Sequence, residues 1–158
     1  MSYDEVDVKV IDKGGANLEQ IRKMLLSLKK KEIQIGILSD AGINEESGTA
    51  IVDYAIANEF GVGNNPERSF LRSTFDEQGD KWSGILNKIV DSVIEGKTDV
   101  QNKIEQAGAV MVGDVKEKIL SNIPPANHPK TTAKKKSNRT LIDTGAMLKS
   151  INFKIISK

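Results

Sequence analysis

The chain has 158 residues, of which 38% are hydrophobic and 4% aromatic, and it contains no cysteine. A chain of this length can bury a core of its own as one domain without disulfides or a metal, and the lack of cysteine excludes thiolate catalysis, iron–sulfur clusters and cysteine-ligated zinc. No apolar run approaches the roughly 20 residues that span a bilayer, and the N-terminus has no signal-peptide core, so we expect an intracellular protein without a membrane partner.

The formal net charge of +1 conceals a segregation of charge along the chain. Residues 1–123 carry 15 basic and 21 acidic side chains, a net charge of −6, whereas residues 124–158 carry 8 basic and one acidic side chain, a net charge of +7. A near-neutral total therefore does not exclude an acidic partner. The positive charges gather in a stretch without acidic residues that contains Lys130, Lys134, Lys135, Lys136 and Arg139.

Strand and helix patterns alternate at the start of the chain. Valines recur at every second position over 6–11, which predicts a strand. Asn17 is a candidate N-cap for a helix over 18–28, where apolar residues recur at spacings of three and four. Alternating isoleucines predict a second strand over 32–38, and the polar, glycine-containing stretch 39–48 predicts a surface loop.

Apolar stripes predict helices through the middle of the chain. The first covers 49–60, and Gly61 stands where a helix C-cap belongs. After a second break, Pro66 is expected to open a short helical segment that carries Phe70, Leu71 and Phe75. Two longer helices follow, with stripes over 82–93 and 100–119 that end at a glycine and at a pair of prolines.

The last part of the chain combines an irregular stretch with a final helix and strand. Residues 124–140 hold three of the four prolines and the basic cluster and lack apolar periodicity, so we expect an extended, mobile segment, called the basic arm below. Asp143 or Thr144 can cap a short helix that runs through Leu148. Apolar residues then alternate over 151–155 as a closing strand.

These elements together predict a single α+β domain over 1–158. Strands at both ends of the chain with helices between them indicate this class. We expect a small mixed or antiparallel sheet of three to four strands packed with about four helices, plus the basic arm within the domain.

No constellation of catalytic residues stands out in the sequence. The single histidine, His128, lies in the basic arm, where no neighbour in sequence is placed to orient it as a general base. Paired carboxylates fall in loops or at helix boundaries, and neither a glycine-rich phosphate loop nor a serine nucleophile motif is present. The sequence therefore predicts a protein that is not an enzyme and that binds no cofactor or metal.

Three blocks of sequence go beyond a generic globular pattern: ANEFG at 57–61, PERSFLR at 66–72 and LIDTGAMLKSI at 141–151. In this order and at these separations they resemble the tail-completion, or head–tail joining, proteins of long-tailed double-stranded DNA bacteriophages. The resemblance covers roughly residues 33–155. It implies a structural virion protein that catalyses no reaction.

Such a protein is expected at the neck of the virion, and in the host cytoplasm during assembly. The resemblance implies a ring, usually a hexamer, that completes the tail end and joins it to the head around the DNA channel. Its partners would be further copies of itself, the head-completion or connector protein, and the tail terminator or tail tube protein. Non-specific contact with the genomic DNA in the channel is a further expectation.

The first two blocks suggest how a helix ends and the next one begins. Phe60 is expected to anchor in the core and Gly61 to end the helix in the left-handed conformation. Pro66 would then fix the entry of the next helix, while Phe70 and Leu71 dock against the core.

Charged and capping residues of the blocks are candidates for contacts between subunits. Arg68 and Arg72, four residues apart, are expected to share a helix face and to present their guanidinium groups to a neighbouring subunit's carboxylates. The alternative is pairing within the chain, to Glu59, Glu67 or Asp76. The run Asp143, Thr144 and Gly145 indicates a helix N-cap that could also position the basic arm.

The basic arm leaves two alternatives open. Its positive side chains could be ordered by an acidic surface of an adjoining ring or by DNA phosphates, or the arm could be an idle, solvated loop. A second function follows from the arm by itself, that of a nucleic-acid-binding accessory protein. Sequence-specific reading of DNA is not expected, because no aromatic residue is interleaved with the lysines.

Overall fold

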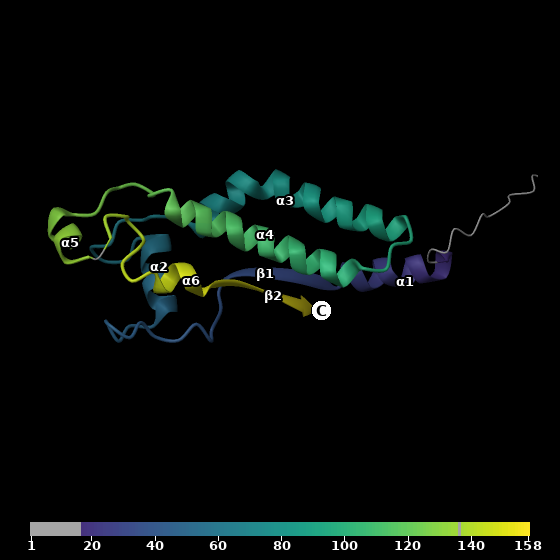
Figure 1. Ribbon diagram of the computed structural model, residues 1–158, viewed down its shortest axis with the longest axis horizontal. Helices are drawn as coiled ribbons and strands as arrows, with labels where there is room; N and C mark the ends of the chain where they lie inside the picture. The colour runs from purple at the N-terminus through teal and green to yellow at the C-terminus, as the bar shows by residue number, and fades with distance from the viewer. Residues whose placement is uncertain (1–16, 136) are drawn as a thin grey trace, which may run out of the picture.

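The computed structural model describes residues 17–135 and 137–158 (Figure 1). The strand predicted over 6–11 lies outside the described residues. In chain order the elements are α1 Leu18–Lys29, β1 Lys31–Ile37, α2 Ile51–Phe60, α3 Leu71–Ile94, α4 Val100–Leu120, α5 Pro129–Lys134, α6 Ala146–Ser150 and β2 Ile151–Ser157. The α+β class is confirmed. Within the described part there are six helices and two strands, so about four helices was too few and a sheet of three to four strands is not seen.

The sheet joins the two ends of the described chain. β1 and β2 pair antiparallel, with Ile33 opposite Ile155, Ile35 opposite Phe153 and Ile37 opposite Ile151. These apolar residues pack against the buried core, so they form the inner face of the sheet. The pair Gln34 and Lys154 belongs to the outer face, where both side chains are exposed. This alternation is the one that the sequence predicts for half-buried strands.

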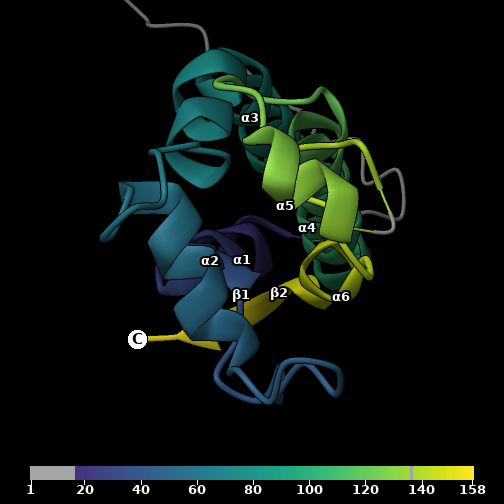
Figure 2. The same ribbon diagram turned by 90° about the vertical axis from the view of Figure 1, so that its left-hand side faces the viewer.

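Helices α3 and α4 form a long antiparallel hairpin in which α4 packs on the inner face of the sheet and α3 packs on α4 (Figure 1). Figure 2 shows α3 farther from the two strands. The core lies between α3, α4 and the strands, and its side chains include Ile89, Val93, Ile104, Met111, Val115 and Ile119. Buried Trp82 of α3 donates its indole N–H to Asp114 of α4 over 2.7 Å, which satisfies the polar atom of the ring. The predicted short segment opened by Pro66 and the helix over 82–93 prove to be one continuous helix that begins at Leu71.

A glycine sets how closely α4 approaches the sheet. A Cβ atom on Gly108 would lie 2.4 Å from the Cδ2 atom of Phe153, a distance at which one of the two groups must move. Gly113 of the same helix has open space around it. The glycine at 108 therefore permits the packing of α4 on β2, although glycine disfavours a helix by about 1 kcal/mol relative to alanine.

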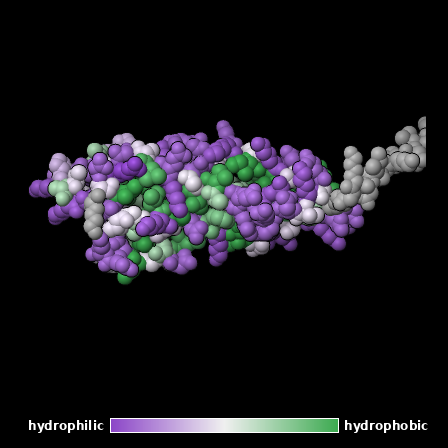
Figure 3. Space-filling view, viewed as in Figure 1, coloured by the Kyte–Doolittle hydropathy of each residue, from purple (hydrophilic) through white to green (hydrophobic). Residues whose placement is uncertain are grey.

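Helix α1 extends beyond one end of the sheet, close to where β1 begins (Figure 1). Asn17 is its N-cap, as predicted, and forms a capping box with Gln20. The helix contains no fully buried residue. In the space-filling view, hydrophobic residues reach the surface in the middle of the molecule and near α2 and α6, among mostly hydrophilic residues (Figure 3).

Candidate functional site

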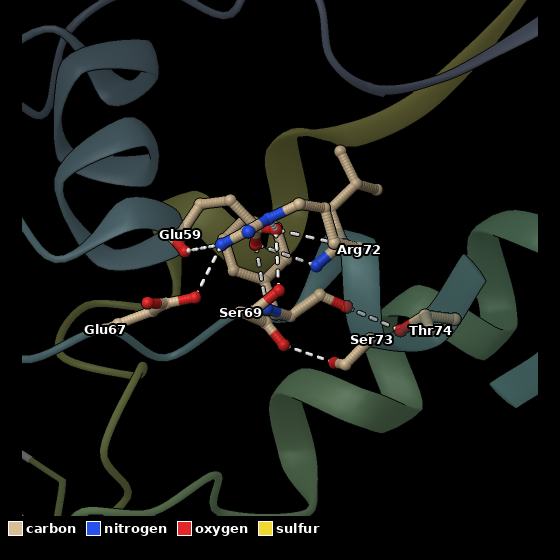
Figure 4. A network of polar contacts seen from close by, with 8 residues as sticks. Glu59, Glu67, Ser69, Arg72, Ser73 and Thr74 are labelled. Atoms are coloured by element: carbon tan, nitrogen blue, oxygen red, sulfur yellow. Dashed lines mark hydrogen bonds and ion pairs between the residues drawn. The ribbon is translucent and has the colours of Figure 1, made fainter. Parts of the chain in front are cut away.

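The carboxylate of Glu59 joins the end of α2 to the start of α3 (Figure 4). Glu59 is only 5% exposed. One of its oxygens accepts the backbone N–H groups of Phe70 and Leu71 over 2.8 and 2.9 Å. The other accepts the hydroxyl of Ser69 over 2.9 Å and the backbone N–H of Arg72 over 3.0 Å. A buried carboxylate at a helix N-terminus satisfies the unpaired N–H groups and interacts favourably with the helix dipole.

Arg72 adds a second set of bonds at the same place. Its Nε donates to the Glu59 carboxylate over 3.0 Å, and one terminal nitrogen donates to the carbonyl of Glu59 and to the carboxylate of Glu67, both over 2.7 Å. The guanidinium lies 4.6 Å from the centre of the Phe60 ring, within the range of a cation–π contact. For Arg72 the structure therefore shows pairing within the chain. We call this cluster of Glu59, Phe60, Glu67, Ser69 and Arg72 the α2–α3 junction.

Two opposing effects act on the pKa of Glu59. Burial raises it, but the bonds from the N–H groups of Leu71 and Arg72 and from the Ser69 and Arg72 side chains together outweigh burial and hold the pKa below its ordinary value. The side chain is therefore ionised at neutral pH. The five hydrogen bonds that this carboxylate accepts hold the end of α2 against the start of α3.

Arg68 does not share a helix face with Arg72, because it precedes α3 in an irregular stretch. It is only 4% exposed. Its backbone N–H donates to the carbonyl of Asn58 over 2.7 Å, and its Nε donates to the carbonyl of Pro125 over 2.8 Å. The prediction that Arg68 faces a neighbouring subunit together with Arg72 is wrong in its geometry. Instead, Arg68 connects the α2–α3 junction to the start of the basic arm.

The other residues of the first two blocks divide into confirmed and corrected predictions. Gly61 adopts the left-handed conformation with φ 68° and ends α2, as expected, and a Cβ there would lie 2.7 Å from the backbone nitrogen of Glu67. Phe70 is buried and Leu71 half-buried. Phe60, however, is 56% exposed and covered by Arg72 rather than anchored in the core.

Pro66 does not open a helix. The residues from 64 to 70 form no regular element, and α3 begins only at Leu71. The prediction missed this because proline at the first helical position is common, whereas here the start of the helix is determined by the distant carboxylate of Glu59. For Glu59 the sequence predicts only a possible ion pair with Arg68 or Arg72. The sequence carries no local signal for this cap, because Glu59 lies more than ten residues before the N–H groups of Phe70 and Leu71 that it accepts.

The basic arm is folded back on the domain and is not extended. His128 caps the short helix α5, with its Nδ1 accepting the backbone N–H of Lys130 over 3.3 Å and Pro129 at the first turn. Further along, the backbone N–H of Thr140 donates to the side chain of Asn122 over 2.8 Å. Together with the bond from Arg68 to Pro125, these contacts close the arm into a loop at one end of the molecule (Figure 1).

The five positive side chains of the arm are not equivalent. Lys130 and Lys134 are exposed on α5. Lys135 points inward and donates to the carbonyls of Arg139 and Thr140 over 3.2 and 3.0 Å, and its burial lowers its pKa. Arg139 is exposed and donates to the carbonyl of Leu120 over 3.4 Å. Lys136 lies outside the described residues. Lys130 and Lys134 are thus the best-placed candidates for contact with an acidic partner.

The third block forms a small hollow beside α2. Gly145, with φ 81°, stands at the N-cap of α6, so the helix begins one residue later than a cap at Thr144 predicts and two residues later than a cap at Asp143 predicts. The hydroxyl of Thr144 accepts the backbone N–H of Ala146 over 3.3 Å and lies 3.5 Å from the side-chain nitrogen of Asn44. Asp143 and Thr144 line an open hollow of about 340 Å³ between this turn and the loop before α2.

Neither a metal-holding group of side chains nor a membrane-spanning helix is found among the described residues. Within 17–135 and 137–158, no three His, Asp or Glu side chains are grouped so as to hold a metal ion. None of the helices in this part of the chain is both long and apolar enough to cross a membrane. The comparisons with known proteins return no significant match to a protein-family model, a curated protein or a solved structure.

Proposed function

We propose that this chain is a structural subunit of the neck of a long-tailed double-stranded DNA phage. It would form a ring, usually a hexamer, that completes the tail and joins it to the head or connector around the DNA channel. The observation that carries the proposal is the serial order of the three sequence blocks at 57–61, 66–72 and 141–151. In the fold, the first two blocks meet in the α2–α3 junction and the third contains α6, which packs on α2.

The distribution of charge supports a role in assembly. The two exposed lysines of α5 lie at one end of an elongated molecule (Figure 1). The sequence up to residue 123 is net acidic, so the basic arm of one subunit would be attracted to this region of another copy. In this proposal the arm contacts protein first, and the DNA in the channel second.

A joining experiment tests the proposal directly. Purified protein is added to tailless heads and headless tails, and joined particles are counted by electron microscopy. The wild-type protein should raise their number, and the double variant Lys130→Glu with Lys134→Glu should lower the yield at least tenfold. The matched control, Lys23→Glu with Lys88→Glu, makes the same charge change at exposed positions outside the arm and should join normally. Joining that proceeds equally well without the protein would refute the proposal.

The exposed lysines also support a second candidate, the nucleic-acid-binding accessory protein. Under this alternative, duplex DNA should bind with an affinity that falls steeply with salt, because phosphate contacts release counterions. The same two double variants separate the candidates. Loss of DNA binding in the Lys130 and Lys134 variant, with no effect of any variant on joining, would favour the accessory protein over the neck subunit.

A further inference from the structure

An apolar groove lies between β1 and α3. It has a volume of about 400 Å³, and its apolar lining includes Ile33, Ile35, Phe75, Trp82 and Leu86. Phe75 is 65% exposed and Leu86 41% exposed, although both belong to the side of α3 that faces the strand. Large apolar side chains left open beside a core indicate that something covers them.

The strand that forms one wall of the groove, β1, has an unpaired edge within the described residues. Within the described residues β1 pairs only with β2, so the N–H and C=O groups on its other edge have no strand partner. A two-stranded sheet is marginal by itself, and such an edge readily accepts an additional strand. An edge that offers hydrogen bonds beside a groove that offers apolar contact is the combination that binds an extended segment.

The segment 5–11, outside the described residues, has the matching sequence. Val6, Val8 and Val10 recur with a period of two, and Glu5, Asp7 and Lys9 alternate with them. If the segment is extended, the three valines share one face and the charged residues the other. We propose that segment 5–11 of the same chain binds antiparallel along the open edge of β1 and places its valines in the groove.

The length of the connection fits this placement. β1 has seven residues, and so has the segment 5–11. α1 points away from the start of β1, and its 12 residues carry the chain about 18 Å from the sheet at 1.5 Å per residue. The six residues 12–17 span up to about 20 Å when extended, enough to return to the start of β1.

Cross-linking in the full chain tests the proposal, because the natural sequence has no cysteine. The pair Val8→Cys and Ser83→Cys places one thiol on the valine face and the other on the groove wall. A short bismaleimide should link them within one chain, seen as a monomer of altered mobility on a denaturing gel. The control pair Lys9→Cys and Ser83→Cys, with the first thiol on the opposite face, should link at least tenfold more slowly.

Three results would overturn the proposal. Equal linking of the two pairs would show that segment 5–11 has no fixed face toward the groove. Linking of the first pair only between chains, as a covalent dimer, would show that a second copy fills the groove instead. Linking of neither pair would count against the proposal as well.

Hydrogen exchange gives a second, independent measurement. The double variant Val6→Asp with Val8→Asp should increase amide exchange in β1 at least tenfold, whereas Asp7→Asn with Lys9→Gln should leave it unchanged. Unchanged exchange of β1 in the valine variant would overturn the proposal. Exchange in the α3–α4 hairpin serves as the internal standard, since a general loss of stability would raise it together with that of β1.

Discussion

Replacement of Glu59 by glutamine removes the charge of the α2–α3 junction while keeping the size of the side chain. The glutamine oxygen can take the place of only one carboxylate oxygen. If it accepts from Ser69 and Arg72, the new amide NH₂ group faces the N–H groups of Phe70 and Leu71, donor against donor. If the amide is turned the other way, the Ser69 hydroxyl and the backbone N–H and Nε–H groups of Arg72 lose their acceptor instead.

The cost follows from these unsatisfied groups. A buried donor left without an acceptor costs about 1–3 kcal/mol, and loss of a negative charge at a helix N-terminus costs a further 0.3–1 kcal/mol or so. Phe70 is buried and Leu71 only half-buried, so water can satisfy the second N–H in part. We therefore expect Glu59→Gln to lower the free energy of unfolding by about 3 kcal/mol.

Urea denaturation at pH 7 measures this change as a lower midpoint with an unaltered slope. The control is Glu67→Gln, which removes the other carboxylate that pairs with Arg72. The Glu67 side chain is 56% exposed, and an ion pair of this kind contributes about 0–1 kcal/mol. If the two variants lose equal stability, or if Glu59→Gln loses less than about 1 kcal/mol, the junction is not the cap of α3 that we describe.

Three further predictions concern pH and packing. The pKa of Glu59 is lower in the folded chain than its ordinary value of 4.5. The stability that the ionised side chain contributes should therefore be complete above pH 4.5 and should disappear as the pH falls through the lowered pKa. Urea denaturation at a series of pH values should show the stability difference between wild type and Glu59→Gln shrinking in acid. Gly108→Ala should destabilise the protein by about 1–3 kcal/mol, because its methyl group would overlap Phe153. Gly113→Ala, in open space, should stabilise it by up to about 1 kcal/mol. If thermal melting ranks the two variants in the reverse order, the packing of α4 on β2 is contradicted. The Thr140 hydroxyl is buried without a hydrogen-bond partner among the described residues, so Thr140→Val should raise the melting temperature or leave it unchanged.

Periodic patterns in the sequence predict most of the regular elements to within a few residues. The strand predicted over 32–38 is observed at Lys31–Ile37, and the helix predicted over 100–119 at Val100–Leu120. Both are elements whose burial repeats with the period of their own backbone, so the chain itself carries the signal. The cap at Asn17 was equally local, since donor and acceptor lie three residues apart.

The α2–α3 junction could not be predicted in the same way. The carboxylate bonds of Glu59 join residues ten to thirteen positions apart, across a stretch without regular structure. Local reasoning placed Phe60 in the core because it extends an apolar stripe, but the ring lies at the last turn of α2, where Arg72 covers it. The start of α3 was misplaced for the same reason, because the acceptor that fixes it comes from another helix.

The basic arm illustrates a local signal that was outweighed by composition. His128 as a cap and Pro129 at the first turn are both typical of a helix start, and α5 begins there. Proline and lysine content nevertheless favoured an extended segment. The contacts that fold the arm back, from Arg68 and Asn122, come from residues outside it and leave no trace in its own composition.

The burial of the sequence blocks determines how their function can be tested. Glu59, Arg68 and Phe70 are largely inaccessible, so none of them can contact a partner ring without unfolding the junction. A joining defect in Glu59→Gln would therefore report lost stability, and it should disappear when the assay is cooled to a temperature at which the variant is fully folded. A joining defect in the Lys130 and Lys134 variant should persist at every temperature, because those side chains are exposed and act by charge. Joining by this variant should also depend less on salt concentration than joining by the wild type. If the chain is the neck subunit that we propose, its three sequence blocks would therefore serve the fold of the domain, and the exposed lysines of α5 are where a role in assembly would be seen.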